Sequence, residues 1–245
     1  TRKIFDYLDI SDKIKWTKIP DCYRLISKRS FDSAVDVTMP TGIDEFINAL
    51  ENYVPGSKPS VTRLFKLAEE IEASTQFFSD FDSKITLKAL RKILKEHGNF
   101  VRTAPYSVNE VFNALKIPQE AQNILNAYWM YLGVDCSRLS FIHYISMVYS
   151  YVKYGSVVPK LRSHAMSMAL AGVVEDFGGE VRYNSHVSRI IFKDGQAEGV
   201  ILKSGEKIMC EHIICNCSPT TAFGKMIKTK DLPERAIKRT NARTF

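Results

Sequence analysis

The spacing of apolar residues changes near Pro159, and this change constrains the fold more than any other feature of the sequence. Between about residues 60 and 155, apolar side chains recur at intervals of three and four, which is typical of amphipathic helices. After Pro159 one further helical stretch is followed by short alternating runs, separated by Asp194-Gly195 and Ser204-Gly205. Such dipeptides favour β-hairpins. The sequence therefore predicts a helix-rich part followed by an α/β part.

Local signals predict several helix ends. Thr41 or Asp44 is expected to cap a short helix. Ser107, with Glu110 three residues later, predicts a capping box. The helix after Pro159 is expected to end at Gly178-Gly179. Its buried side is predicted to comprise Met166, Leu170, Val173 or Val174, and Phe177.

Strand signals occupy two regions of the sequence. Residues 16–40 predict two strands joined by a turn at Lys28-Arg29-Ser30. Further strands are expected in the second part, at residues 180–183, 187–192, 199–203, 207–210 and 213–216.

The composition narrows the class of protein. Five cysteines in 245 residues form no disulfide scaffold, and they favour a reducing, cytoplasmic setting. The sequence contains no uncharged apolar run of the ~18–20 residues that span a bilayer. Seven Lys or Arg lie between Lys225 and Phe245, against Asp231 and Glu234. We interpret this stretch as a solvated surface, with peripheral membrane association as the alternative. Because no base-reading motif accompanies it, nucleic-acid binding is not expected.

A series of short motifs lies between Pro159 and Pro219. They are Pro159-Lys160, Ala169-Leu170-Ala171, Gly178-Gly179-Glu180-Val181, Val187-Ser188-Arg189-Ile190, Gly199-Val200, Ser204-Gly205-Glu206 and Asn216-Cys217-Ser218-Pro219. In sequence and spacing this stretch resembles the phytoene desaturase, carotenoid isomerase and retinol saturase group of FAD-dependent oxidoreductases. The resemblance extends more loosely upstream, through Trp129-Met130-Tyr131-Leu132-Gly133 and the two early strands.

The resemblance implies the fold and its division into domains. The fold class is α/β with an α+β substrate part, a fragment of the glutathione-reductase-like FAD/NAD(P)-binding fold. Residues 1–158 are expected to form the substrate-binding domain, 159–224 part of the FAD-binding domain, and 225–245 a basic segment leading into a further part. Because the chain begins at Thr1 without Met, we expect an internal piece of a longer protein.

The resemblance also implies an FAD cofactor and some of its contacts. Val187, Asn216 and Ser218 occupy the positions of the family's flavin contacts within this stretch. The Gly-x-Gly-x-x-Gly fingerprint of dinucleotide-binding loops occurs nowhere in the chain. We therefore expect these 245 residues by themselves to bind FAD weakly or not at all and to be inactive. The whole enzyme would act on a carbon–carbon bond of a long apolar lipid or isoprenoid, with or without a carboxylate.

The chain departs from the family where two glycines usually follow the Pro-Lys pair, because Leu161-Arg162 stands there. Arg162 is a candidate to hold a carboxylate or phosphate through paired hydrogen bonds. His164 is a candidate for proton transfer near neutral pH. The alternative is that Arg162 and His164 only cap a helix and face solvent. Candidate substrate contacts are Lys160, Arg162, His164, Tyr128, Trp129, Tyr144 and Tyr151.

Two further hypotheses concern metal binding and lost catalysis. Cys210, His212, Cys215 and Cys217 lie close in sequence, but a strand would point them to opposite faces. Buried or half-buried strand cysteines and no metal site are therefore predicted. The alternative function is a non-catalytic lipid or prenyl carrier, because the Rab escort and GDP-dissociation-inhibitor proteins resemble flavoproteins of this fold.

Overall fold

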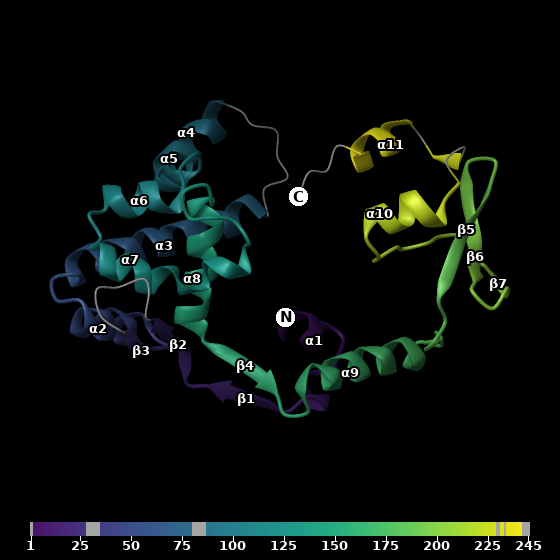
Figure 1. Ribbon diagram of the computed structural model, residues 1–245, viewed down its shortest axis with the longest axis horizontal. Coiled ribbons are helices and arrows are strands. Elements are labelled where there is room, and N and C mark those ends of the chain that lie inside the picture. Colours follow the sequence, from purple (N-terminus) through teal and green to yellow (C-terminus); the bar gives the residue numbers. More distant parts are fainter. Residues whose placement is uncertain (1, 28–34, 80–86, 229–230, 233, 242–245) are drawn as a thin grey trace. The chain divides into compact units, whose positions relative to one another are not determined.

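The computed structural model describes residues 2–27, 35–79, 87–228, 231–232 and 234–241 (Figure 1). The chain forms two compact units, Thr1–Ala169 and Leu170–Phe245. The division falls inside helix α9 (Arg162–Asp176), whereas the sequence predicts a boundary at 158/159, which stays a prediction. Each unit is described by itself below.

Unit 1, Thr1–Ala169, is mostly helical, as the apolar spacing predicts. Its larger helical elements are α2 (Ile43–Tyr53), α3 (Lys58–Ser79), α4 (Leu87–Glu96), α5 (Gly98–Thr103), α6 (Val108–Ala114), α7 (Gln119–Leu125), the 3-10 helix η2 (Asn126–Tyr131) and α8 (Phe141–Tyr154). Two short elements precede them, α1 (Arg2–Tyr7) and η1 (Ser11–Lys13).

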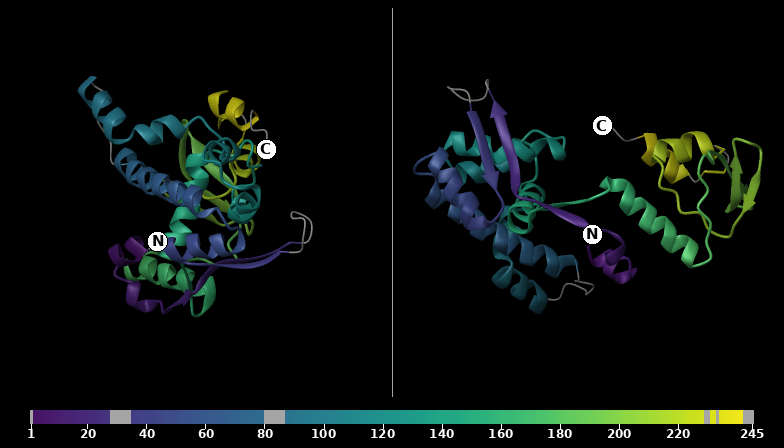
Figure 2. Two further views of the ribbon diagram at one scale, coloured as in Figure 1. Left: turned by 90° about the vertical axis from the view of Figure 1, so that its left-hand side faces the viewer. Right: turned by 90° about the horizontal axis from the view of Figure 1, so that it is seen from below.

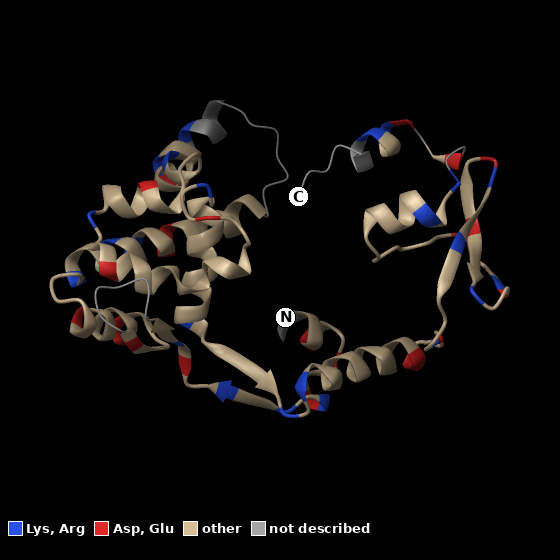
Figure 3. Ribbon diagram, in the orientation of Figure 1, with Lys and Arg blue, Asp and Glu red and all other residues tan. Residues whose placement is uncertain are grey.

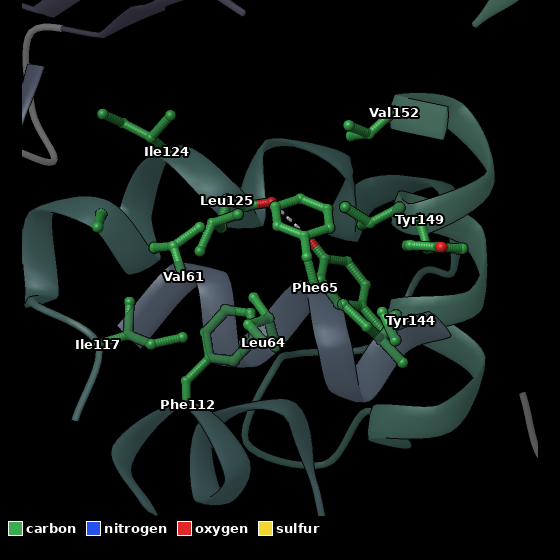
Figure 4. Packing of buried hydrophobic residues seen from close by; sticks show 14 of the residues in the cluster. Val61, Leu64, Phe65, Phe112, Ile117, Ile124, Leu125, Tyr144, Tyr149 and Val152 are labelled. Atoms are coloured by element: carbon green, nitrogen blue, oxygen red, sulfur yellow. Dashed lines mark hydrogen bonds between the residues drawn. The ribbon is translucent and has the colours of Figure 1, made fainter. Parts of the chain in front are cut away.

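The core of unit 1 lies around α3 and α8. Leu64 and Phe65 of α3 are buried, as are Phe112 of α6 and Tyr144 of α8 (Figure 4). The rings pack edge to face, with the Phe46 and Phe65 centroids 5.5 Å apart. Burial of so many apolar side chains removes them from water, and this stabilises the helical block without any other unit.

One predicted cap is confirmed and another is wrong. Ser107 and Glu110 form the reciprocal capping box at the start of α6. Helix α2 is capped by neither Thr41 nor Asp44, because its N-cap is Gly42, whose φ is +100°. The Thr41 hydroxyl instead donates to the Pro20 carbonyl over 3.0 Å. Glycine tolerates this backbone conformation, and the helix starts there without a side-chain capping bond.

Two antiparallel strand pairs belong to unit 1. β2 (Asp21–Ser27) pairs with β3 (Val35–Pro40), which confirms the predicted hairpin, while its turn residues lie outside the described part of the chain. β1 (Trp16–Ile19) pairs with β4 (Ser156–Pro159), so segments far apart in sequence run side by side away from the helices (Figure 2). The chain thus enters and leaves the helical block through one ribbon.

Unit 2, Leu170–Phe245, contains most of α9 and a three-stranded meander. Its other elements are β5 (Val187–Lys193), β6 (Gln196–Leu202), β7 (Lys207–Met209), α10 (Pro219–Thr221), the π-helical turn η3 (Ala222–Met226) and α11 (Glu234–Asn241). Asp194 and Gly195 have φ values of +51° and +80°, and Gly205 has +92°. Both predicted hairpin turns are confirmed, because these residue types tolerate positive φ.

Three expectations for the second part are wrong. Helix α9 has no buried residue, although an apolar side was predicted; Leu170, Val174 and Phe177 are 37%, 45% and 86% exposed. The segments 180–183 and 213–216 are irregular rather than strands. A strand exists only where a neighbour supplies its backbone partners, and the described residues offer none to these segments. The helix end at Gly178-Gly179 is confirmed, with Gly178 at φ +80°.

Every helix in the described part of the chain is too short or too polar to cross a bilayer.

Candidate functional site

A cluster of tyrosines joins β2, η2 and α8. The rings of Tyr23 and Tyr128 meet edge to face at a centroid distance of 4.9 Å. Tyr128 stacks on Tyr151 at 4.9 Å with an interplanar angle of 19°. Tyr131 contacts Tyr128 and Tyr151 at 5.5 and 6.3 Å. Two of the predicted substrate residues, Tyr128 and Tyr151, therefore lie in direct contact.

The buried hydroxyls of this region serve the backbone. Tyr128 donates to the Cys22 carbonyl over 2.5 Å, and Tyr144 donates to the Leu125 carbonyl over 2.6 Å (Figure 4). Tyr144 is fully buried and Tyr128 is 6% exposed. Because each ring is buried and its hydroxyl donates to a backbone carbonyl, both rings contribute to the packing of unit 1. Their predicted role as walls of a substrate tunnel stays a prediction.

The same region resists ionisation. Burial raises the pKa of Tyr128 and Tyr144, and the negative charge of neighbouring tyrosine or cysteine groups raises it further. Burial, together with the charge of Asp21, raises the pKa of the Cys22 thiol to about 11. These groups are therefore neutral at physiological pH, which makes them unsuited to general acid–base work.

An exposed aromatic edge borders the buried tyrosines. We define it as Trp129, Met130, Tyr131 and Tyr151. Trp129 is 41% exposed and Met130 and Tyr131 are each 68% exposed, while Tyr151 is half-buried. Met130 and Tyr131 were missed by the sequence analysis, although the run Tyr128 to Tyr131 was the available signal. In a 3-10 helix consecutive residues point to different sides, so this run cannot be buried as a whole.

The junction of β4 and α9 carries the predicted basic residues. The Lys160 amide donates to the Lys15 carbonyl over 2.9 Å and so continues the β1–β4 ladder. The side chains of Lys160, Arg162 and His164 are exposed, and within the described residues none of them has a hydrogen bond or ion pair. Their side chains are thus free to meet a ligand.

Arg162 has an unusual backbone conformation. It is the first residue of α9 and has a φ of +59°, in the left-handed region that glycine adopts most readily. A non-glycine residue there costs roughly 1–2 kcal/mol. The turn into α9 therefore keeps a glycine-like backbone although its sequence lacks glycine.

The predicted flavin contacts lie in unit 2. Val187, the first residue of β5, is half-buried and pairs with Leu202. It borders a hollow of about 370 Å³ whose other lining residues are Glu180, Arg182, Ser185, Val200, Leu202 and Ile208. Arg182 is held at its rim by Glu180 and Glu206, each at 2.7 Å.

Asn216 and Ser218 do not belong to that hollow. Both are exposed in the coil before α10, and Ser218 is the N-cap of α10 without a side-chain capping bond. Val187 is therefore the predicted flavin contact that the structure places in a concave site.

The cysteines near α10 lie differently from the prediction. Cys210 is half-buried, but Cys215 and Cys217 are exposed, with their sulfurs 3.3 Å apart. They are exposed because the predicted strand at 213–216 is not formed. Within the described residues, no group of three or more His, Cys, Asp or Glu gathers as a metal site would require.

Comparison with known proteins finds relatives among enzymes of carotenoid metabolism. No protein-family model matches the chain. Prolycopene isomerase 2 of an Oncidium hybrid cultivar is 26% identical over 205 residues, covering 78% of this chain and 33% of that protein. Hydroxyneurosporene desaturase of Cereibacter sphaeroides is 38% identical over 74 residues, covering 30% of this chain and 14% of that protein. The chain is thus similar to carotenoid isomerases and desaturases. It spans about a third of the length of the isomerases that it matches.

Two solved structures share the fold. An oxidoreductase from Methanosarcina mazei aligns with a TM-score of 0.56 and 10% identity, covering 98% of this chain and 50% of that one. Rab GDI from Plasmodium falciparum aligns with a TM-score of 0.51 and 15% identity, covering 89% and 47%. The expected mixture of helix-rich and α/β parts is therefore that of a portion of these larger folds.

Proposed function

We propose that the chain is part of an FAD-dependent oxidoreductase that acts on a carbon–carbon bond of a long apolar isoprenoid or related lipid. The relationship to the prolycopene isomerases, which extends over 78% of the chain, carries this proposal. The motifs between Pro159 and Pro219, which run from the end of β4 to the start of α10, support it. Desaturation, saturation and isomerisation are the reaction types that fit.

The backbone at Arg162 supports retention of the family's active-site turn. Its φ of +59° reproduces what glycine would adopt at a position where the family places glycine. The exposed guanidinium then adds a group that a carboxylate or phosphate binds through two parallel hydrogen bonds. We therefore propose that Arg162, with Lys160 beside it, anchors a charged end of the substrate.

His164 lies two residues further along α9, with its ring exposed. An imidazole takes up and releases protons near neutral pH. It is our candidate for moving a proton at the substrate, and Arg162 and His164 are the catalytic candidates of this chain.

The hollow beside Val187 fits one end of the cofactor. Its lining combines the apolar side chains of Val187, Val200 and Ile208 with the polar Arg182 and Ser185, which suits a flat ring with a hydrogen-bonding edge. We propose that it holds the adenine of FAD, with Asn216 and Ser218 contributing elsewhere. The flavin, when bound, supplies the hydride chemistry. Because no Gly-x-Gly-x-x-Gly loop lies in this sequence, we propose that residues elsewhere in the complete protein bind the phosphates.

The exposed aromatic edge fits the substrate. The edge offers an apolar chain the flat rings of Trp129 and Tyr131 and the polarisable side chain of Met130. Tyr151 joins them through its contact with Tyr131. We propose that this edge binds the polyene or isoprenoid body. Tyr128 and Tyr144 support it from within the core.

The visible absorption spectrum of the product of the complete gene tests the proposal. We expect a bound-flavin spectrum, while residues 1–245 alone, mixed with FAD, remain colourless after gel filtration. A complete product that is colourless and takes up no FAD would contradict it. That outcome would favour a prenyl or lipid carrier, the alternative to which the structural similarity to Rab GDI points.

A pair of variants tests Arg162 as an anchor. Arg162→Gly removes the guanidinium and keeps the left-handed backbone, whereas Arg162→Lys keeps a positive charge. For a carboxylate-bearing substrate we expect KM to rise about tenfold or more in the glycine variant and less in the lysine variant. A neutral carotenoid should show no such change. Unchanged turnover and KM for both substrates in Arg162→Gly would reject the anchor.

A further inference from the structure

A second concave site lies on unit 1, away from the residues assigned above. It is a pocket of about 880 Å³ between α3, α5 and α6. Its lining residues are Arg63, Lys66, Leu67, Glu70, Asn99, Arg102, Thr103, Tyr106, Glu110, Val111, Asn113, Ala114 and Leu115. The volume lies within the ~300–1,000 Å³ typical of small-molecule sites. None of these residues belongs to the proposed flavin or substrate site.

The floor of this pocket is apolar. Val111 is buried in the core and Leu67 and Leu115 are half-buried, so each presents part of its side chain to the pocket. Tyr106, at the edge, is 47% exposed. An apolar surface of this kind gains free energy when a ligand removes it from water. The apolar floor therefore favours a ligand with a hydrocarbon body.

Each acidic side chain of the rim already accepts a hydrogen bond from a neighbouring residue. Glu70 accepts from the Asn99 amide over 2.5 Å. Glu110 accepts from both the backbone amide and the hydroxyl of Ser107, and these bonds hold the pKa of Glu110 below its usual value. Each carboxylate thus already accepts at its Oε2 atom, and these bonds tie both side chains to neighbouring residues of unit 1.

The cationic side chains of the rim have fewer hydrogen-bond partners than the carboxylates. Arg63 uses one guanidinium nitrogen to donate to the Leu115 carbonyl over 3.1 Å. Lys66 and Arg102 are exposed and, among the described residues, have neither a hydrogen bond nor an ion pair. They come from different helices, α3 and α5, that both line the pocket. The rim therefore offers two cationic side chains that have no partner among the described residues.

We propose that this pocket binds a single-chain anionic amphiphile, with its carboxylate between Lys66 and Arg102 and its hydrocarbon chain on Leu67, Val111 and Leu115. The hydrocarbon chain accounts for the apolar floor, and the carboxylate accounts for the two free cations. Charge-assisted hydrogen bonds from both side chains then fix the orientation of the ligand. This site goes beyond the proposed function, because it needs no flavin and shares no residue with the redox site.

Calorimetric titration of the chain with decanoate and with decan-1-ol tests the proposal. Decanoate is expected to bind with a stoichiometry of about one and more tightly than decanol, since only decanoate bears the charge. The double variant Lys66→Gln/Arg102→Gln should weaken decanoate at least about tenfold and leave decanol unchanged. The matched control Arg91→Gln/Lys95→Gln removes the same charge from α4, outside the pocket, and should bind decanoate like the original chain.

A third variant tests the location of the hydrocarbon chain. Ala114→Trp fills the pocket from an exposed position, so it should weaken both ligands while circular dichroism shows an unchanged helix content. Equal binding of decanoate to Ala114→Trp and to the original chain would overturn the proposal. So would equal affinity for decanoate and decanol, or loss of binding in the α4 control. The chain could also fail to bind decanoate and instead bind a synthetic acidic amphipathic helix through Lys66 and Arg102. That result would overturn the proposed ligand and indicate a protein partner.

Discussion

The two units differ in how completely they bury their own apolar surface. In unit 1, Val61, Leu64 and Ile71 of α3 are fully buried against α8 and its neighbours. In the described part of unit 2, the buried side chains are Ile190, Leu202 and Ala222, while Phe177 and Ile214 are 86% and 99% exposed. Helix α9 carries no charged residue between Arg162 and Glu175 and yet has no buried side (Figure 3).

Unit 1 covers its own apolar surfaces, whereas the described part of unit 2 leaves α9 uncovered. A helix with an apolar side needs another layer to cover it, and unit 1 provides that layer from its own sequence. Unit 2 shows helix and hairpins whose local signals are strong, but its described residues provide no layer over α9. Local signals are therefore enough to form elements, whereas burial requires a partner surface.

The largest expected effect concerns the core of unit 1. Phe112→Ala removes a fully buried ring and should lower the free energy of unfolding by about 3–5 kcal/mol. Urea unfolding measures the loss, and amide hydrogen exchange should locate it in α3, α6 and α8. A loss below about 1 kcal/mol would mean that this core is less tightly packed than the structure shows.

A smaller effect is expected for the meander of unit 2. A Cβ added at Gly199 would collide with the Ile208 carbonyl oxygen on β7, so Gly199→Ala should cost about 1–3 kcal/mol. Faster exchange of the β5–β7 amides, with α3 and α8 unchanged, is the expected result. Gly224→Ala is the matched control, because a Cβ there meets open space. Equal exchange in both variants would contradict the close approach of the strands.

Alkaline pH should lower the free energy of unfolding of unit 1 more than that of unit 2. The pKa of Cys22 is about 11 in the folded chain, above its ordinary value near 9, so folding favours the protonated thiol. The stabilisation is complete below pH 9 and is lost as the pH rises towards 11, because the unfolded thiol ionises first. Urea midpoints across this window measure the loss, and Cys22→Ala should reduce it. A variant with the same pH dependence would assign the effect to the buried tyrosines instead.

The smallest effect is expected at Phe177. Because this ring is 86% exposed, Phe177→Ser should change the free energy of unfolding of the 245-residue chain by less than about 0.5 kcal/mol. The same substitution in the product of the complete gene sharpens the comparison. A loss of more than about 1 kcal/mol there would show that a further layer covers α9.

Much of the local structure could be predicted from the sequence. The Ser107–Glu110 capping box, the turns at Asp194-Gly195 and Ser204-Gly205, and the end of α9 at Gly178 depend on a few neighbouring residues, and all are confirmed. The resemblance to carotenoid isomerases and desaturases could also be recognised, because the motifs follow one another closely from Pro159 onwards. Such features are decided by backbone preferences within a few residues of chain.

The candidate site was less predictable. Periodicity marked Tyr128, Trp129, Tyr144 and Tyr151 alike as ring-bearing positions, but only the packing separates buried Tyr144 from exposed Trp129. The pocket between α3, α5 and α6 was not foreseen, since Lys66 and Arg102 belong to separate helices with no shared motif.

By itself, the sequence determined the helix-rich and α/β parts of this protein, their turns and caps, and its relationship to carotenoid desaturases and isomerases. These properties follow from residue type and spacing along the chain. Only the tertiary structure decided the left-handed backbone at Arg162, the exposed side of α9 and the concave sites. The physical reason is that burial, backbone strain and cavity shape depend on which distant segments meet, and spacing along one segment does not encode its partner.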